Sequence, residues 1–427
     1  MPPTAKAQLY RARYLVPMAG EPLEDGAVLV EAGRIVAVGP YATLRRHHAA
    51  LIDCGDAILL PPLVNAHTHL ELTDFPTWAA ALADLAAGET FVDWIRRVVQ
   101  VKRARSGDDF AASVKHGIAQ SLAAGTGAVG DILSHFAACS AYAASPLRGR
   151  LFFETLGHDP ARTQPQLQEI ATLLAAGLCG RLLPGLAPHA PYSLSAAHLA
   201  ATVAQALREQ APLTLHAAES REEVALIRAA AGPIAQVLYP LAGWELPSPQ
   251  HSSPIAYLSR QGALTPGMLL VHGVQVDAAD VALIAAAGCG MVLCPRSNAR
   301  LGVGTAPAAL YRQLGVPLAL GTDSLASNDS LSLWDEIAAA RRVYPAFSPL
   351  ELLHLATAGG AALLGLQGEM GTLQSGSGAH FQLLRPNSLP ALAELAEFLA
   401  SPGRSAEVAE LFLDGEEVLA KEPALRL

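Results

Sequence analysis

Two histidines, His67 and His69, are separated by one residue at the end of an apolar segment that begins at Leu63. Residues two apart on a strand point to the same side, so both imidazoles can reach one metal ion. His216 and Asp323 each follow another apolar segment. Each residue alone has an ordinary structural explanation, but three histidine nitrogens and a carboxylate oxygen together suit Zn²⁺, or another divalent ion such as Fe²⁺. We predict one divalent metal bound by these four side chains.

Two further residues could transfer protons beside such a metal. Glu219 comes three residues after His216, and His272 lies between Val271 and Gly273. Glu219 could equally sit at a solvated helix N-terminus, where acidic residues are favoured, and His272 could be a core histidine. Beside a metal, Glu219 would donate and accept protons, while His272 and Asp323 would hold and deprotonate a water molecule. We predict Glu219, His272 and Asp323 as the catalytic residues.

Eight short apolar segments, separated by stretches with helical periodicity, place these side chains at strand ends. Their number and their spacing over residues 61–366 predict a (β/α)8 barrel, in which the chemistry lies at the carboxyl ends of the strands. A doubly wound open sheet is the alternative, but no GxGxxG motif opens a helix. The predicted strands are Leu63–Thr68, Gly127–Ile132, Arg150–Thr155, Leu182–Pro188, Leu213–Ala217, Met268–Gly273, Gly290–Cys294 and Val316–Gly321.

The two ends of the chain, residues 1–60 and 367–427, read as short strands joined by tight turns. Turn signals at Ala32–Arg34 and at Asp414-Gly415 predict one hairpin in each end. A helix is expected over Leu389–Leu399. Inside the barrel region, residues 71–107 form a long insertion with an amphipathic helix, Phe91–Lys102, so this segment is a candidate lid over the barrel mouth.

The composition argues against several classes of protein, namely nucleic-acid-binding, membrane-spanning and secreted proteins. The chain has 427 residues, a formal net charge of −9, 51% hydrophobic residues and 16% charged residues. This composition predicts a large buried core, and the absence of a basic stripe argues against a nucleic-acid partner. No apolar run reaches the roughly 20 residues of a membrane span, and no secretory signal is evident. Five scattered cysteines without a CxxC pair predict reduced thiols and a cytoplasmic location.

Five motifs together resemble the amidohydrolase superfamily: Asn65-Ala-His-Thr-His, Leu215-His-Ala-Ala-Glu, Val271-His-Gly-Val, Cys294-Pro-Arg-Ser-Asn and Gly321-Thr-Asp-Ser. The resemblance covers nearly the whole chain. It implies a barrel with a small β-sandwich built from both chain ends, and it is strongest for the branch of aminopurine deaminases and triazine hydrolases. One departure is His380, which stands where that family usually has an aspartate, in the predicted sandwich and away from the site.

The lysine distribution bears on the number of metals. Members of the superfamily with two metals generally bridge them with a carboxylated lysine from a middle strand. This chain has no lysine between Lys115 and Lys421. The bridge therefore cannot form in that way, and the resemblance implies a single-metal site of the deaminase type.

The resemblance also implies a substrate. His189, in a Pro-His-Ala-Pro-Tyr segment, would contact a purine, and Glu154 a sugar hydroxyl. Arg162, Arg148 or Arg296 could pair with a substrate carboxylate. Segments around His67 and Glu154 most resemble aminodeoxyfutalosine deaminases, which act in a route to menaquinone. Deaminases of adenosylhomocysteine, methylthioadenosine or guanine, a triazine chlorohydrolase and a non-catalytic assembly protein remain alternatives. We expect an aminopurine nucleoside as substrate, no nucleic-acid or membrane partner, and a homodimer.

Overall fold

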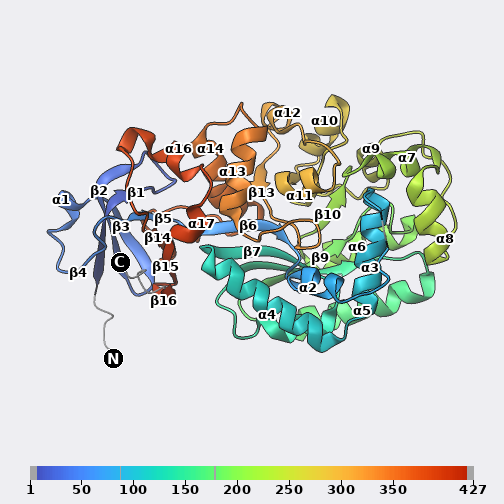
Figure 1. Cartoon of the computed structure of the whole chain (residues 1–427), viewed down its shortest axis with the longest axis horizontal. Helices are drawn as coiled ribbons and strands as arrows, with labels where there is room; N and C mark the ends of the chain where they lie inside the picture. Colours follow the sequence, from blue (N-terminus) through green and yellow to red (C-terminus); the bar gives the residue numbers. More distant parts are fainter. Residues whose placement is uncertain (1–6, 87, 177–178, 421–427) are drawn as a thin grey trace.

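The computed structural model describes residues 7–86, 88–176 and 179–420. The outermost residues of both predicted end segments, 1–6 and 421–427, therefore lie outside the described part. Figure 1 shows a smaller β-rich part, built from the first and the last described segments of the chain, beside a larger part in which helices surround parallel strands. The predicted α/β fold with a second, smaller β-rich part is confirmed at this level.

The larger part contains eight short strands in two four-stranded parallel sheets. Nearly all of their side chains are buried, as expected for strands covered on both faces. Each of the eight predicted strands is present, with small differences at its ends. The strands are β6 (Leu63–Thr68), β7 (Thr126–Leu133), β8 (Arg148–Thr155), β9 (Leu183–Pro188), β10 (Thr214–Ala217), β11 (Leu269–His272), β12 (Gly290–Leu293) and β13 (Leu318–Leu320).

Single parallel bridges join the two sheets at both of their edges. Leu186 of β9 bridges to Leu213 beside β10, and Thr68 of β6 bridges to Asp323 beyond β13. At the second seam, the backbone N–H of Asp323 donates to the carbonyl oxygen of His67 at 3.1 Å. The last strand is thus hydrogen bonded to the first, and two predicted metal ligands become neighbours.

Helices alternate with the strands and cover their outer faces (Figure 1). The segment 71–107 contains α2 (Phe75–Ala80) and α3 (Phe91–Arg103), which confirms the predicted amphipathic helix. Thr90 and Asp93 form a reciprocal capping box that fixes the start of α3. The other long helices are α4 (Gly107–Ala123), α5 (Pro160–Ala176), α6 (Ala196–Glu209), α7 (Arg221–Ala229), α10 (Ala278–Ala286) and α13 (Leu333–Val343).

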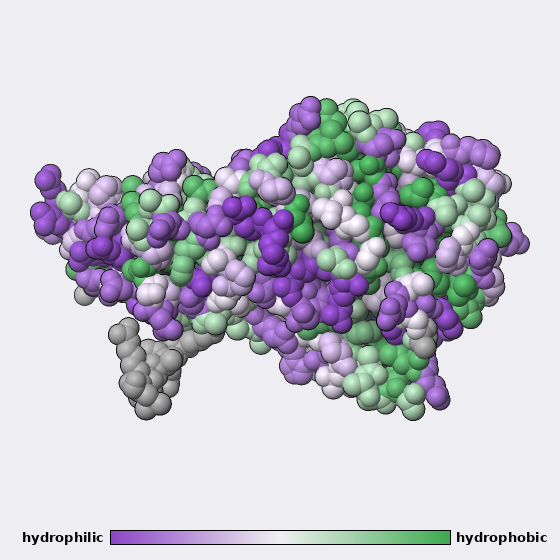
Figure 2. All heavy atoms as spheres, turned by 45° about the horizontal axis from the view of Figure 1, so that its top comes forward, coloured by the Kyte–Doolittle hydropathy of each residue, from purple (hydrophilic) through white to green (hydrophobic). Residues whose placement is uncertain are grey.

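Shorter helical segments complete the larger part. They are η1 (Leu70–Leu72), η2 (Phe136–Tyr142), η3 (Ile234–Leu238), α8 (Tyr239–Ala242), α9 (Pro254–Arg260), α11 (Pro295–Arg300), α12 (Ala308–Gln313), α14 (Pro349–His354), η4 (Leu355–Gly359) and α15 (Gly360–Leu363). Within the described residues, no single helix is both long and apolar enough to cross a membrane. Only the bent pair Arg221–Ala229 and Ile234–Ala242, taken together, reaches that length and apolar composition. On the face seen in Figure 2, hydrophilic and hydrophobic residues are interspersed.

The smaller part is one continuous mixed sheet rather than the two separate sheets of the predicted sandwich, because β5 pairs with both β1 and β14. The Tyr10 ring of β1 nevertheless lies 4.8 Å from the Phe381 ring of β14, so the sheet curls over its own core. Its strands are β1 (Gln8–Leu15), β2 (Leu23–Glu31), β3 (Arg34–Pro40), β4 (Ala50–Asp53), β5 (Ile58–Leu60), β14 (Phe381–Leu384), β15 (Val408–Leu413) and β16 (Glu416–Ala420).

Both predicted hairpins are present. Ala32 and Gly33 have φ values of 49° and 73° between β2 and β3, and Asp414 and Gly415 have 56° and 78° between β15 and β16. Positive φ at both central residues is the requirement of a type I′ turn. The expected helix Leu389–Leu399 is shorter: α16 spans Leu395–Leu399 after a short η5 segment, Leu392–Glu394. Leu389 is not helical because the residue before a proline disfavours helical geometry.

The turn at Asp414 joins the two parts of the molecule. Its carboxylate accepts hydrogen bonds from Arg148, at the start of β8, and from Arg181 at 2.7 Å. The buried His380 accepts the Asp414 backbone N–H at 3.0 Å, and burial lowers the pKa of His380 to about 4. His380 therefore stabilises this junction as a neutral residue, in the smaller part where the sequence predicted it.

We predict that Asp414→Ala lowers the free energy of unfolding by about 1–2 kcal/mol, because it removes two half-exposed ion pairs and a residue type suited to positive φ. Asp414→Asn, which keeps the turn preference, should lose less. Urea denaturation measures both values, with Asp56→Ala, at an exposed residue in the loop between β4 and β5, as the control. Equal losses in Asp414→Ala and Asp56→Ala would show that the turn does not join the two parts.

Candidate metal centre and active site

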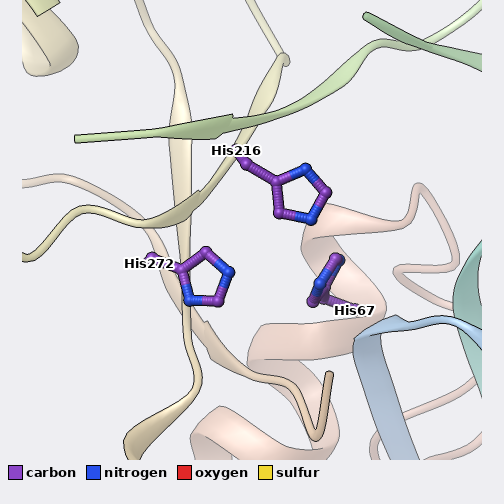
Figure 3. A group of neighbouring side chains, drawn as sticks. All are labelled: His67, His216 and His272. Carbon is purple, nitrogen blue, oxygen red and sulfur yellow. The ribbon is translucent and has the colours of Figure 1, made fainter. Parts of the chain in front are cut away.

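Four predicted metal ligands and His272 lie together at the carboxyl ends of their strands. His67 is on β6 and His69 follows it, His216 is on β10, His272 ends β11, and Asp323 follows β13. Figure 3 shows the rings of His67, His216 and His272 turned toward one another. Parallel strands all end on the same side of their sheet, which explains why residues distant in sequence meet here.

The side-chain atoms are close enough to share one ion. The Nε2 atoms of His69 and His216 are 3.3 Å apart, and the Nε2 atoms of His67 and His69 lie 3.5 and 3.7 Å from Asp323 Oδ1. Two overlapping groups, one of His67, His216 and His272 and one of His67, His69 and Asp323, each have ligand atoms within 4.8 Å of one another. His272, which was predicted to hold a water molecule, is thus also close enough to contact an ion bound by this group.

Outer hydrogen bonds aim the ring nitrogens at the centre. Nδ1 of His216 lies 2.9 Å from the His189 carbonyl oxygen, and Nδ1 of His272 lies 2.9 Å from Asn298 Oδ1. Each Nδ1 therefore carries the proton and each Nε2 keeps its lone pair, as is usual for metal-binding histidines. Asp323 Oδ2 accepts hydrogen bonds from Ser297 and Ser327, both at 2.7 Å. The sequence analysis did not identify these two serines.

Burial keeps the histidines neutral. It lowers the pKa values of His67, His216 and His272, and that of His69 to about 3. Burial opposes ionisation of Asp323, but the neighbouring His67, whose Nε2 lies 3.5 Å from Asp323 Oδ1, holds the pKa of Asp323 well below the usual range. Both ring nitrogens of His67 are buried without a hydrogen-bond partner among the described residues. Neutral imidazoles, one carboxylate and an unpartnered buried His67 fit a divalent cation.

Glu219 lies beside this centre in a loop after β10. It is 3% exposed, its Oε1 has no hydrogen-bond partner among the described residues, and that atom lies 3.6 Å from His272 Nε2. Burial, followed by the Asp323 charge, raises its pKa well above the usual value. The raised pKa favours the protonated form of Glu219, which can donate its proton to a ligand.

The Glu219 loop is held by Glu223, a residue that the sequence analysis missed. The two carboxylate oxygens of Glu223 accept the backbone N–H groups of Ala218 and Glu219, each at 2.9 Å. Ala218 has a positive φ of 51°, so this bend needs such support. The available signal was the spacing Ser220-x-x-Glu223, since Ser220 caps the helix that follows.

A pocket opens next to the centre, with roughly 500 Å³ of empty space including its open mouth. The enclosed part that water-sized molecules can enter is about 80 Å³, which is smaller than a typical small-molecule site. The structure brings the predicted substrate residues His189 and Glu154 into its wall, together with residues of the 71–107 segment. The lining residues are His69, Leu72, Trp94, Val98, Lys102, Glu154, His189, Tyr192, His216, Glu219, His272, Asp323 and Ser324.

The predicted arginines do not line this pocket. Arg148 begins β8 whereas Glu154 lies near its other end, so Arg148 sits at the far end of the strand and pairs with Asp414. The Arg162 side chain is 89% exposed on α5. Arg296 is tied to Asp329, Asn328 and Glu336. The pocket wall instead contains Lys102, which sequence reasoning counted but did not place in the site.

A parallel α/β fold with a buried cluster of histidines and an aspartate at its strand ends is typical of metal-dependent hydrolases. The chain belongs to the amidohydrolase family, whose model matches residues 58–418. It is 34% identical to the aminodeoxyfutalosine deaminase of Deinococcus radiodurans, over 80% of this chain and 81% of that protein. It is 31% identical to the 5-methylthioadenosine/S-adenosylhomocysteine deaminase of Desulforudis audaxviator, over 96% of this chain and 93% of that protein.

Solved structures agree with this assignment. An adenosine deaminase from Xanthomonas campestris with bound zinc superposes with a TM-score of 0.81 at 27% identity, over 98% of this chain and 94% of that one. The family and its neighbours have a barrel with an additional domain, in agreement with the predicted architecture. The relatives also confirm the predicted class, a hydrolase that acts on carbon–nitrogen bonds.

We predict that a strong chelator lowers the thermal midpoint of the native protein and that added Zn²⁺ restores it. A ligand at 100 times its dissociation constant stabilises the folded state by about 2.7 kcal/mol. Differential scanning calorimetry should show this shift in the wild type and in His354→Gln, which changes an exposed histidine on α14, but not in His67→Asn. A zinc-dependent shift that persists in His67→Asn would contradict the assigned ligands.

Proposed function

We propose that the protein hydrolytically deaminates an aminopurine nucleoside and releases ammonia, in a single-metal site on a closed eight-stranded barrel. The observation that carries this proposal is the buried carboxyl group of Glu219: its Oε1 lies 3.6 Å from His272 Nε2 and has no hydrogen-bond partner among the described residues, and its pKa is raised by burial. Deamination of a purine requires an acid that protonates the ring nitrogen next to the reacting carbon. Glu219 is suited to that role.

The metal ligands in this proposal are His67, His69, His216 and Asp323, with His272 beside them. When bound, a divalent ion would supply the Lewis acidity that makes water a nucleophile near neutral pH. We favour Zn²⁺, which prefers nitrogen and carboxylate ligands, and Fe²⁺ is the second choice.

The side chains divide the proton transfers between them. Asp323 and His272 accept a proton from the attacking water, while Glu219 gives its proton to the ring nitrogen beside the carbon under attack. The oxygen–carbon bond forms, the bond between that carbon and its amino group breaks, and ammonia leaves with a proton returned through the same groups. His189, whose Nδ1 is fixed by Ser193 at 2.7 Å and whose pKa burial lowers to about 4, offers a neutral imidazole to the purine.

The relatives support two substrates. Our first candidate is 6-amino-6-deoxyfutalosine, which would place the enzyme in menaquinone biosynthesis, because that is the substrate class named for the D. radiodurans relative. The second is methylthioadenosine or adenosylhomocysteine, named for the D. audaxviator relative. A triazine chlorohydrolase and a non-catalytic assembly protein have less support, since the latter would be expected to lack ligands that are present here.

We predict that the zinc-loaded protein releases ammonia from at least one of these nucleosides. The assay follows ammonia from aminodeoxyfutalosine, methylthioadenosine, adenosylhomocysteine, adenosine and guanine under identical conditions. A kcat/KM for aminodeoxyfutalosine at least tenfold above the others would support the first candidate. Higher values for methylthioadenosine or adenosylhomocysteine would select the second, and no release from any compound would refute the deaminase proposal.

We predict that Glu219→Gln retains zinc but loses turnover by a factor of about 10² to 10⁴, the usual contribution of general acid–base catalysis. The variant keeps the size of the side chain and removes its proton transfer. Zinc content by elemental analysis and steady-state ammonia release measure the two effects. Glu222→Gln, on the neighbouring helix turn, is the control and should keep both properties. Near-normal turnover in Glu219→Gln would exclude this residue as the acid.

A further inference from the structure

Two buried cysteines, Cys139 and Cys179, lie in contact with each other outside the active-site pocket. Cys139 belongs to η2, and Cys179 lies in the segment between α5 and β9. Their Sγ atoms are 3.7 Å apart, both residues are 2% exposed, and both thiols are free. The thiols of Cys54 and Cys289 donate to backbone carbonyl oxygens instead. Two thiols in contact can be oxidised to a disulfide within the chain.

Backbone contact, and not only the side-chain rotamers, brings the two segments together. Gly180 follows Cys179 and has a φ of 61°, and a Cβ atom added to it would lie 2.2 Å from the carbonyl oxygen of Tyr142. Tyr142 ends η2, and its hydroxyl donates to the buried carboxylate of Asp131 on β7. Both segments are therefore fixed at the level of the backbone beside the two sulfur atoms.

The two sulfur atoms need only a small movement to bond, and they lie close to the surface. A disulfide has a sulfur–sulfur distance of about 2.05 Å, so the two atoms must approach by about 1.7 Å, which rotation about both χ1 bonds divides between them. Ser140 and Gly180, which follow the two cysteines in the sequence, are exposed. A molecule as small as hydrogen peroxide therefore has one layer of residues to cross.

The hydrogen bond between the thiols makes them chemically different. Donation from Cys179 lowers the pKa of the Cys139 thiol against the opposing effect of burial, and the same bond raises the pKa of Cys179. Burial raises the pKa of Cys54 and that of Cys289 to about 11. Because the thiolate is the reactive form of cysteine, Cys139 is the thiol best suited to react first.

The helical segment η2 that carries Cys139 also supports the pocket wall. It begins directly after Ser134 and His135, whose backbone N–H groups donate to the buried Glu71 at 3.0 and 2.9 Å. Glu71 accepts Lys102 Nζ at 2.8 Å, and Lys102 lines the pocket. A covalent bond to η2 would thus attach a support of the pocket to a distant part of the chain.

We propose that Cys139 and Cys179 are a redox-sensitive pair, which a hydroperoxide oxidises to a reversible disulfide that ties η2 to the segment before β9. The thiolate of Cys139 attacks one peroxide oxygen, so a sulfur–oxygen bond forms, the oxygen–oxygen bond breaks and the released hydroxide takes a proton. The sulfur of Cys179 then displaces hydroxide from the Cys139 sulfenic acid, and its proton leaves with that hydroxide as water. Two thiols and one hydrogen peroxide give one disulfide and two waters.

Peroxide treatment of the zinc-loaded protein tests the pair, because zinc itself has no redox chemistry. Free thiols are alkylated in denaturant after the treatment, and an unreduced tryptic digest is analysed by mass spectrometry. Trypsin leaves each cysteine of the pair in a peptide of its own, residues 116–148 and residues 163–181. We expect these two peptides to be joined, with three of the five thiols still free, and dithiothreitol to restore all five. Cys139 should lose its thiol about tenfold faster than Cys54.

Single substitutions separate the roles of the two cysteines. In Cys179→Ser, Cys139 should still react but end as a sulfinic acid without a crosslink, whereas Cys139→Ser should leave the thiol of Cys179 intact. Cys54→Ser, at a buried cysteine of the smaller part, is the matched control and should form the same crosslink as the wild type. The crosslink joins positions 40 apart, so it should raise the thermal midpoint of the wild type, with no rise in treated Cys139→Ser.

Four results would overturn the proposal. A wild type that keeps all five thiols in excess peroxide has no reactive pair, and a crosslink to another cysteine would assign the wrong partner. A crosslink that forms only in urea would show that the native arrangement does not support it. A lower thermal midpoint after crosslinking would show that the bond forms only by distorting the fold. The proposed deamination is tested separately by ammonia release and does not depend on these results.

Discussion

The structure depends on one electrostatic constraint: several imidazoles and a carboxylate meet in a space from which water is largely excluded. Nε2 atoms 3.3 Å apart, as in His69 and His216, are tolerated only when the rings are neutral or share a cation. Burial keeps them neutral, and His67 has no hydrogen-bond partner among the described residues. The second layer of hydrogen bonds, from Asn298 and the His189 carbonyl, exists to orient these rings rather than to neutralise them.

The two parallel sheets contribute different residues to the site around this cluster. The seam between β6 and β13 brings Asp323 against His67, so that the hydrogen bond between their backbones also brings two of the predicted metal ligands together. In the proposed mechanism, the β10–β13 sheet carries the groups that transfer protons, and the β6–β9 sheet carries His189 and Glu154, which would contact the rest of a ligand. Chemistry and recognition could then be changed separately, as expected where function lies in loops at strand ends.

The strands, and the cluster of histidines and an aspartate at their ends, could be predicted from sequence because their signals are local: apolar runs bounded by single polar residues, and a histidine pair with the period of a strand. Other features could not be predicted, because they depend on which end of a strand a residue occupies or on partners that are distant in the sequence. Arg148 begins β8 and so lies far from Glu154, although both belong to one segment. Lys102 and Glu71 are separated by 31 positions, and their pairing exists only because α3 packs over the pocket. The continuous small sheet likewise depends on the pairing of β5 with β14.

The central claim is a single divalent ion held mainly by histidine nitrogens. Zinc K-edge X-ray absorption on protein reconstituted with one equivalent of Zn²⁺ tests it most directly. The account predicts nitrogen and oxygen ligands at about 2.0–2.2 Å, with the multiple scattering of at least three imidazoles and no zinc–zinc distance. Sulfur ligands at about 2.3 Å, a second zinc nearby, or a spectrum of hydrated zinc without imidazole scattering would contradict it.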